Sequence, residues 1–355
     1  MNAPWKDRQV ALALSGGGIR AMLFHLGVLR CIAENGGLEF ITRISTVSGG
    51  SLLIGLILHK CNYRWPTSEQ FITSVYPSLR IDLCTRSLQC GAVRQLLWPH
   101  NWCYLFSRAN LLAKALQDEW GITADLSTLG PVPEWSINGT TAETGKRFRF
   151  KHDSLGDYTL GYAFPSDFPL ADAMAVSAAF PGGFGPLSLE TQKFVWKKRP
   201  AWNAPVESAC ATKVAFQRLH LYDGGVYDNL GLEPFFDSGR KAPKADIDYI
   251  FVSDAGAPLA PGFSSFSLNP WRLKRVADIM SDQARALRVR TFMSYLEGDA
   301  ARGGYAFIGI PAEADRCIDG LQPASFPTTL RCVTLNEFDC IAGHGFAVAR
   351  TLHGG

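Results

Sequence analysis

Three serines, Ser45, Ser48 and Ser51, stand at three-residue spacing around a pair of glycines in the segment ISTVSGGSLLIG. A nucleophilic serine of a hydrolase lies on a sharp strand-to-helix turn, where glycines two residues before and after it relieve crowding. Ser45 lies within an apolar strand pattern, and Ser51 falls in the first turn of the helix that follows. Ser48 comes where the strand stops and has Gly50 two residues later, although Thr46 stands at the preceding position. The pattern favours Ser48 as the nucleophile, while Ser-Gly-Gly is also an ordinary turn sequence.

A second loop, Gly16-Gly17-Gly18, follows one apolar strand and opens a helix. The free N–H groups at a helix N-terminus form an anion site. Gly16, Gly18 and Ala21 fit the dinucleotide-binding pattern G-x-G-x-x-A, but that pattern needs an acidic residue at the end of the second strand, where Ser48 stands instead. The alternative is an oxyanion hole, which needs a nucleophile at a neighbouring strand end. Ser48 meets that requirement.

A candidate general base, Asp223, ends the apolar strand in LHLYDGGVYDNLG and precedes Gly224 and Gly225. The carboxyl ends of parallel strands share one edge of a sheet, where ligands bind. We therefore expect Asp223 near Ser48, with partial burial raising the pKa of its carboxyl group toward that of a useful base.

Other histidines and aspartates of the sequence are alternatives to Asp223 as partners of Ser48. His344 would complete a Ser…Asp…His order, although an α/β-hydrolase places its nucleophile after more strands than are present here. His220 is three residues from Asp223 on one strand and should face the opposite side of the sheet. Asp254 repeats the strand-aspartate pattern more weakly, and Asp228 with Asn229 is expected to cap a turn.

The periodicity of apolar residues predicts the elements that position these groups. Strands are expected over 9–14 and 40–47 and helices over 19–34 and 52–59, which gives a parallel sheet with right-handed crossovers. Two strands joined by a turn are expected over 135–150, a helix over 171–180, strands over 219–222 and 248–252, and a long helix over 271–294. Residues 62–130 read as irregular and rich in aromatic side chains.

The composition excludes several classes of protein. The chain has 355 residues, 47% of them hydrophobic, and a formal net charge of +3, which is too small to indicate a nucleic-acid partner but is compatible with anionic membranes. The N-terminal segment does not resemble a secretory signal, and no apolar run approaches the roughly 20 residues of a membrane-spanning helix. Nine scattered cysteines without a CxxC pair favour reduced thiols. We therefore expect a cytoplasmic protein.

Together the three motifs resemble those of patatin-like phospholipases. The glycine loop followed by Arg20 is similar to the family's G-G-G-x-R/K, the segment 46–50 to its G-x-S-x-G, and the segment 223–225 to its D-G-G/A. Residues 175–186 and 135–150 also resemble family segments. The resemblance covers about residues 8–258, with an insert at about 62–130 and a helical extension over about 262–355, within one expected domain of 1–355. Thr46 departs from the motif's first glycine and should be tolerated if its φ angle stays negative.

The resemblance implies a three-layer α/β/α fold with a mostly parallel central sheet, and a lipid acyl hydrolase acting on phospholipids or lysophospholipids. Ser48 would attack the ester carbonyl and Asp223 would take its proton. The oxyanion hole would comprise the loop Gly16-Gly17-Gly18 together with Gly49, the N–H groups of Gly17, Gly18 and Gly49 being the donors.

The supporting residues implied by the resemblance are Gly50, Gly224, Gly225 and Arg20. Arg20 would steady the glycine loop or contact a lipid phosphate, unless it forms a surface ion pair. The chemistry needs no metal and no cofactor.

Two other functions remain open on the same motifs: a catalytically silent lipid-binding or scaffold protein, and an acyltransferase that uses the same acyl-enzyme. The expected partners are the lipid substrate and, transiently, a membrane surface. Trp98 and Trp102, in LLWPHNWCYLF, suggest an interfacial anchor, or else aromatic side chains that fill the core of the insert. The sequence indicates no oligomeric state.

Overall fold

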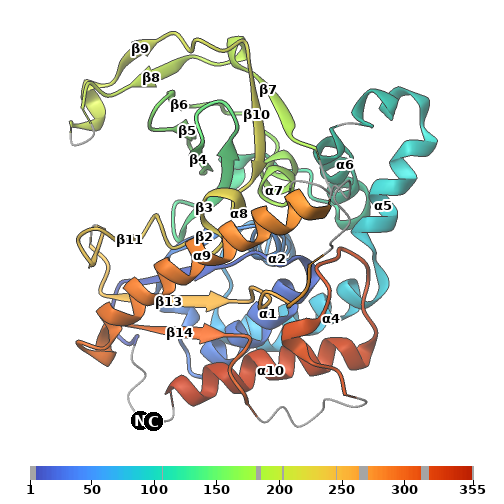
Figure 1. Ribbon diagram of the computed structural model, residues 1–355, viewed down its shortest axis with the longest axis vertical. Helices are drawn as coiled ribbons and strands as arrows, with labels where there is room; N and C mark the ends of the chain where they lie inside the picture. Colours follow the sequence, from blue (N-terminus) through green and yellow to red (C-terminus); the bar gives the residue numbers. More distant parts are fainter. Residues whose placement is uncertain are drawn as a thin grey trace.

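The structure is a computed structural model that describes residues 5–105, 107–180, 185–201, 204–244, 246–263, 271–312 and 320–353. The described chain forms a twelve-stranded mixed sheet with helices on both faces (Figure 1). Its lower half is parallel, in the order β14 (Gly303–Phe307), β13 (Tyr249–Asp254), β1 (Val10–Leu14), β2 (Ile41–Thr46) and β3 (Glu134–Thr141).

The central strand β1 is apolar throughout because both of its faces are covered, as expected for a parallel strand. Val10, Leu12 and Leu14 point into the larger core, whereas Ala11 and Ala13 point into a second, smaller core on the opposite face.

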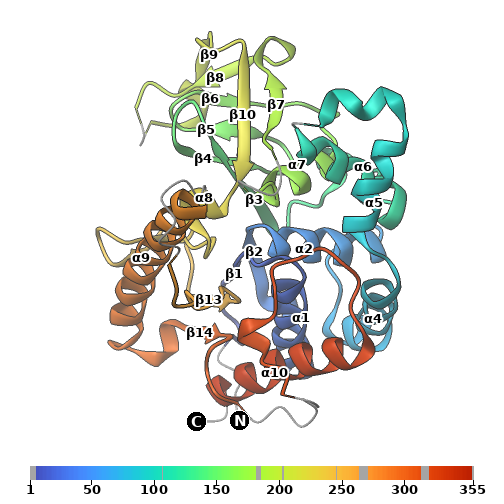
Figure 2. The same ribbon diagram turned by 45° about the vertical axis from the view of Figure 1, so that its right-hand side comes forward.

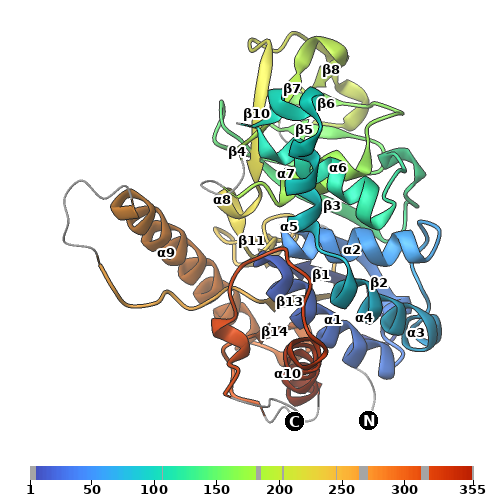
Figure 3. The ribbon, with the colours of Figure 1, turned by 90° about the vertical axis from the view of Figure 1, so that its right-hand side faces the viewer.

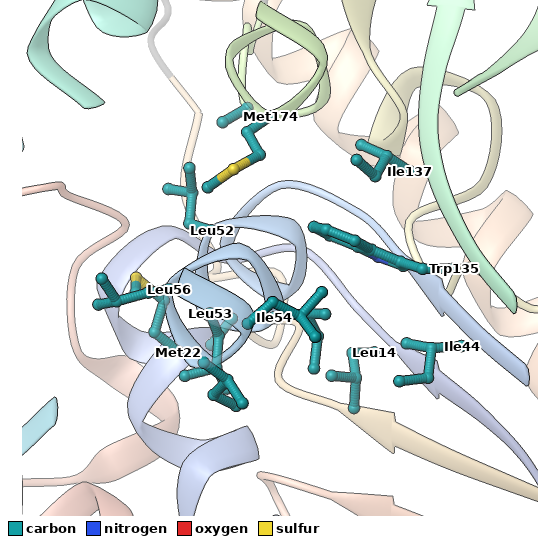
Figure 4. Close-up of a cluster of buried hydrophobic side chains, with 14 of the residues drawn as sticks. Leu14, Met22, Ile44, Leu52, Leu53, Ile54, Leu56, Trp135, Ile137 and Met174 are labelled. Carbon is teal, nitrogen blue, oxygen red and sulfur yellow. The ribbon is translucent and has the colours of Figure 1, made fainter. Parts of the chain in front are cut away.

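Helices α1 (Gly18–Glu34), α2 (Gly49–Lys60) and α10 (Leu335–His353) enclose the larger core. The smaller core lies between the sheet and α9 (Trp271–Leu296), which contributes Phe292. In Figure 4 the apolar side chains of α2, among them Leu53 and Ile54, face Met22 of α1 and the sheet residues Leu14 and Trp135. The sheet is therefore the middle of three layers.

The upper half of the sheet is antiparallel (Figure 1). Beyond β3 it continues through β4 (Lys146–Phe150), β5 (Leu155–Asp157), β6 (Gly161–Ala163), β8 (Trp196–Lys198) and β9 (Cys210–Thr212). Strand β10 (Arg218–Asp223) pairs with β3 and with β7 (Leu187–Glu190). A separate hairpin joins β11 (Phe236–Asp237) to β12 (Ala242–Pro243).

The remaining helices are short. The insert contains α3 (Ser68–Gln70), a π-helical turn η2 (Phe71–Val75), α4 (Tyr76–Thr85), α5 (Leu88–Arg94), the 3₁₀ segment η4 (Pro99–Tyr104) and α6 (Arg108–Trp120). Helices α7 (Leu170–Ser177) and α8 (Gly225–Asp228) flank the end of β10. Figure 2 shows α5 and α6 beside α7, and α9 on the other side of α8.

The predicted fold class, α/β with a mostly parallel central sheet and a helical C-terminal part, is confirmed. Two details differ. Residues 62–130, expected to be irregular, contain several short helices because their apolar residues pack onto α1 and α7. The C-terminal part also supplies the edge strand β14, which the sequence did not predict. Figure 3 shows the N-terminal part of α9 extending away from the body of the molecule, whereas its C-terminal part, with Phe292, packs in the smaller core.

Candidate active site

The turn between β2 and α2 places Ser48 in a backbone conformation that residues with a side chain avoid. Its φ is 50° and its ψ is −119°. Non-glycine residues with positive φ cluster at functional sites, where the surrounding structure holds them against the strain. A Cβ atom on Gly49 would lie 2.2 Å from the Gly18 carbonyl oxygen, and one on Gly50 would lie 2.8 Å from that of Leu14. The two glycines therefore let the turn approach the loop after β1.

The structure separates the three serines of the motif. Ser45 is buried and its Oγ accepts a hydrogen bond of 2.9 Å from the Asn138 side chain. Ser51 is buried in α2 and its Oγ lies 2.7 Å from the Oγ1 atom of Thr46. Of the three serines, only Ser48 has a hydroxyl group close enough to Asp223 to lower the pKa of its carboxyl group.

Asp223 reaches this position by a different route from the one predicted. The sequence pattern predicts a strand parallel to β2, but β10 is antiparallel to β3, with Asp223 paired to Gly139. Strand β3 is parallel to β2 only as far as Ile137, opposite Thr46, and then extends beyond the edge of the parallel strands. Strand β10 therefore approaches that edge from above and ends next to the turn that carries Ser48.

The environment of Asp223 raises the pKa of its carboxyl group toward neutral pH. Burial raises the pKa of Asp223 to about 7, while hydrogen bonds from the Gly225 N–H and the Ser48 hydroxyl act in the opposite direction. The Gly225 N–H donates to Oδ1 at 2.7 Å. A carboxylate with this pKa is ionised at the upper end of the physiological range and can take a proton from a bound hydroxyl group.

The end of helix α7 connects the two residues. The Ser48 N–H donates to both the carbonyl oxygen and the Oγ of Ser177, each at 3.0 Å. Two residues later, the Ala179 carbonyl accepts the Asp223 N–H at 3.1 Å. One short segment therefore fixes the backbone of both Ser48 and Asp223. It belongs to the Ala/Ser-rich segment 175–186, of which 181–184 lie outside the described residues.

The glycine loop lies directly beneath the Ser48 turn. Gly17 has a φ of 148° and Gly18 a φ of 59°, values that favour glycine. The Gly16 N–H already donates to the Asn229 carbonyl at 3.1 Å, which differs from the expectation that Gly16 belongs to the oxyanion hole. Among the described residues, the N–H groups of Gly17, Gly18 and Gly49 have no hydrogen-bond acceptor.

Arg20 lies in the first turn of α1 and is buried. Its guanidinium donates to the carbonyl oxygens of Ala255 and Phe326, at 3.0 and 2.5 Å, so it forms no surface ion pair. Burial lowers the pKa of Arg20 to about 10. Arg20 joins the start of α1, and with it the glycine loop, to two other segments of the chain.

His25, which no sequence motif marks, supports the same loop. The ring is fully buried, with Nε2 2.9 Å from the Ser15 carbonyl oxygen and Nδ1 2.7 Å from Ser253 Oγ. Burial lowers the pKa of His25 to about 4, so the ring is neutral at pH 7. His25 is a polar residue in an otherwise apolar stretch of α1, and this is the only signal in the sequence that could have indicated its role.

The alternative catalytic groups have other roles. His344 Nε2 lies 2.8 Å from the Ile308 carbonyl oxygen, and its ring is 6.0 Å from that of Phe24, in the interface between α10 and α1. His220 pairs with Glu143, Nδ1 to Oε1 2.6 Å, on the half-exposed side of β10. Among the described contacts, neither histidine reaches Ser48.

Neither of the other aspartates duplicates Asp223. Asp254 is fully buried and forms an ion pair with Arg285, Nη2 to Oδ2 2.6 Å, and its Oδ2 also accepts the Tyr305 hydroxyl. Asp228 accepts the N–H groups of Leu230 and Glu233, as predicted for a turn cap.

Trp98 and Trp102 of the insert are exposed, by 59% and 63%, so these two side chains do not fill its core. In the described ranges no helix is long and apolar enough to cross a membrane, and no three metal-binding side chains cluster. A cavity of about 570 Å³ lies at the far end of the sheet, lined by Phe194, Trp196 and neighbouring residues, and contains neither Ser48 nor Asp223.

The expectation of reduced cysteines holds for seven cysteines: Cys31, Cys61, Cys84, Cys90, Cys103, Cys210 and Cys332. It is wrong for Cys340 of α10, which is disulfide-bonded. Cys317 lies outside the described residues.

Comparison with known proteins agrees with this geometry. The family model described as patatin-like phospholipase matches residues 12–236. The fold is similar to that of human GIVD cytosolic phospholipase A2, with a TM-score of 0.56, 14% identity, and coverage of 98% of this chain and 61% of that one. The same human protein in complex with methyl gamma-linolenyl fluorophosphonate gives a TM-score of 0.53 at 15% identity, over 98% of this chain and 57% of that one. This chain thus spans about three fifths of the length of these structures.

No curated protein sequence matches the chain. The family match covers more than half of the chain and includes the glycine loop, Ser48 and Asp223. The chain belongs to the patatin-like phospholipase family.

Proposed function

We propose that this protein hydrolyses fatty-acyl esters of phospholipids or lysophospholipids, with Ser48 as nucleophile and Asp223 as general base. The approach of the Ser48 hydroxyl group to the buried Asp223 carboxyl group, at a turn with positive φ, carries the proposal. It is supported by three N–H groups beside that turn, those of Gly17, Gly18 and Gly49, which have no acceptor in the part of the chain that the structure describes.

The reaction has two halves. Ser48 Oγ attacks the ester carbonyl carbon as its proton passes to Asp223, and the N–H groups of Gly17, Gly18 and Gly49 stabilise the negative oxygen. The intermediate then expels the alcohol, which takes the proton back from Asp223 and leaves an acyl group on Ser48. In the second half Asp223 takes a proton from water, whose oxygen attacks the acyl carbonyl carbon. The intermediate then breaks its bond to Ser48 Oγ, which takes the proton back from Asp223, and the fatty acid leaves.

An activity assay tests the proposal. The purified enzyme is incubated with lysophosphatidylcholine, and the free fatty acid is measured by mass spectrometry. We expect turnover by the wild type and a loss of roughly 10⁴ to 10⁶ in kcat for Ser48→Ala, because removal of a nucleophile has effects of that size. No fatty acid from the wild type, beside intact binding to lipid vesicles, would favour the silent scaffold. Transfer of the acyl group to an added alcohol, in preference to water, would favour the acyltransferase.

We further propose that the segment 93–105 contacts the membrane surface. Leu97 is 77% exposed, and Val93, Trp98, Trp102 and Leu105 are also exposed on the same segment. Residues 83–117 include three arginines and one lysine and no acidic residue. Exposed tryptophan and leucine side chains with basic neighbours are typical of interfacial segments that bind anionic lipids. Helix α6 connects this segment to α7, whose end holds Ser48 and Asp223.

A further inference from the structure

Thr46 stands where the family motif has its first glycine, two residues before Ser48. Its side chain is fully buried and its φ is not positive, so threonine fits without strain. The structure also shows that its hydroxyl group is in use. Thr46 Oγ1 accepts a hydrogen bond of 2.8 Å from Trp135 Nε1 and lies 2.7 Å from Ser51 Oγ.

These contacts continue to the nucleophile. Ser51 Oγ lies 2.8 Å from Ser177 Oγ, which accepts the Ser48 N–H at 3.0 Å. The chain of hydrogen bonds therefore runs from Trp135 through the hydroxyl groups of Thr46, Ser51 and Ser177 to the backbone of Ser48. The indole N–H and the Ser48 N–H can only donate. The hydroxyl groups at the two ends of the series, those of Thr46 and Ser177, are therefore both acceptors for them.

All members of this chain are held by packing. Thr46, Ser51 and Ser177 are fully buried, and Trp135 is almost so. Figure 4 shows Trp135 in the apolar cluster between the sheet and α2, with Ile137 and Ile54 around its ring. A buried hydrogen-bond chain anchored at a packed indole fixes its far end better than an isolated pair would.

We propose that Thr46 is a positioning residue, which acts through Ser51 and Ser177 to hold Ser48 in its positive-φ conformation with the hydroxyl group toward Asp223. In a chain with glycine at this position the Trp135 N–H and the Ser51 hydroxyl would both lose this partner. The threonine thus takes part in setting the position of the reacting group. A misplacement of that group by about 1 Å can lower the reaction rate by up to about a hundredfold.

The test compares three substitutions of Thr46. Thr46→Val keeps the shape and removes the hydroxyl, Thr46→Gly restores the motif residue, and Thr46→Ser keeps the hydroxyl. We expect kcat to fall about tenfold in the valine and glycine variants and to stay near wild type in the serine variant, in line with a modest displacement of the nucleophile. KM and the acidic limb of kcat/KM should not change, because Asp223 and the substrate contacts are untouched. Trp135→Phe should lower kcat in the same direction.

The control is Thr191→Val. Thr191 is also buried and its Oγ1 donates to the Phe216 carbonyl at 2.6 Å, but it lies at the far end of the sheet. This variant should lower Tm without changing kcat. The proposal is overturned if Thr46→Val behaves like Thr191→Val, or if Thr46→Gly is as active as the wild type.

The inference rests on the proposed ester hydrolysis, and the same experiment separates the two. An active wild type with equally active Thr46 variants would overturn the positioning role alone. A wild type that neither hydrolyses an ester nor reacts with a fluorophosphonate would overturn both.

Discussion

At the scale of single residues, the site consists of groups held in unfavourable states. Ser48 has a positive φ. Asp223 is a buried carboxyl group, and no cationic side chain contributes to the shift of its pKa. States of this kind lower stability and persist because neighbouring contacts fix them. Here the fixing contacts come from Ser177, Ala179 and Gly225. At each position, a replacement that suits the same surroundings, glycine for Ser48 or asparagine for Asp223, should therefore relieve the unfavourable state.

The first prediction concerns the strain at Ser48. Ser48→Gly removes the penalty for positive φ, whereas Ser48→Ala keeps it, and both remove the nucleophile. We expect the glycine variant to be the more stable of the two by about 1 kcal/mol in the free energy of unfolding, since glycine adopts this conformation freely. Urea denaturation of both variants measures the difference, and an alanine variant of equal or greater stability would contradict the assigned strain.

The second prediction concerns Asp223. Its folded pKa is raised to about 7, so the folded state loses stability as the pH rises from about 4 through 7. The full shift corresponds to about 4 kcal/mol. Asp223→Asn should therefore abolish hydrolysis and raise Tm relative to wild type at pH 8, with a much smaller difference at pH 4.5. A Tm difference that does not depend on pH would show that the pKa of Asp223 is not raised in the folded state.

At the scale of elements, the sequence predicted well where periodicity is strong. The predicted strand over 9–14 is β1, the predicted helix over 19–34 is α1, and the second strand and helix are β2 and α2. Their apolar runs are buried on both faces, so pattern and structure agree. Most of the short strands of the upper sheet were not predicted, because three- to five-residue strands carry too few residues for a pattern.

The direction of β10 could not be predicted from its sequence. An apolar strand that ends in aspartate has the same sequence pattern whether it is parallel or antiparallel to its neighbour. The position of Asp223 next to Ser48 depends on β3, which extends past the parallel strands and pairs with β10 there. The contacts of Thr46 were equally hidden, since Trp135 and Ser177 are distant in sequence.

The third prediction concerns the junction of β1 and α1, where His25 supports the glycine loop. Its pKa is lowered to about 4 in the folded state, so stability is lost as the pH falls from about 6.5 through 4. The shift corresponds to about 3 kcal/mol. In His25→Gln an amide can donate to the Ser15 carbonyl without titrating.

The measurement is the difference in free energy of unfolding between wild type and His25→Gln, from pH 7.5 to pH 4.5. The Gln variant should be less sensitive to acid than the wild type. Parallel pH profiles for the two proteins would show that His25 accepts a proton in the folded state.

At the scale of the whole molecule, the C-terminal part completes the fold. Strand β14 pairs with β13, and α10 packs along α1. These contacts support the proposal that residues 1–355 fold as one domain. On another side, the exposed segment 93–105 projects from the helices that pack on α7. The core and the proposed membrane contact are therefore made by different parts of the chain.

The fourth prediction tests that separation. The double variant Trp98→Ala/Trp102→Ala should bind vesicles of phosphatidylglycerol and phosphatidylcholine more weakly, because both side chains are exposed and apolar. Its Tm and its hydrolysis of a soluble short-chain ester should match the wild type. Tyr158→Ala/Phe164→Ala, which removes two exposed aromatic rings around β6, serves as the control and should bind vesicles normally. A joint loss of Tm and ester hydrolysis in the tryptophan variant would contradict this separation, because it would show that the two side chains stabilise the fold.

The pairing of Ser48 with Asp223 is tested most directly by reaction with a fluorophosphonate ester, followed by mass-spectrometric mapping of the modified peptide. We expect a single phosphonylated residue, Ser48, no labelling of Ser48→Ala, and slow labelling of Asp223→Asn, which lacks the base. His344→Ala should label at the wild-type rate. Modification of Ser45 or Ser51, undiminished labelling of Ser48→Ala, or a His344→Ala protein that folds but does not label would contradict the pairing.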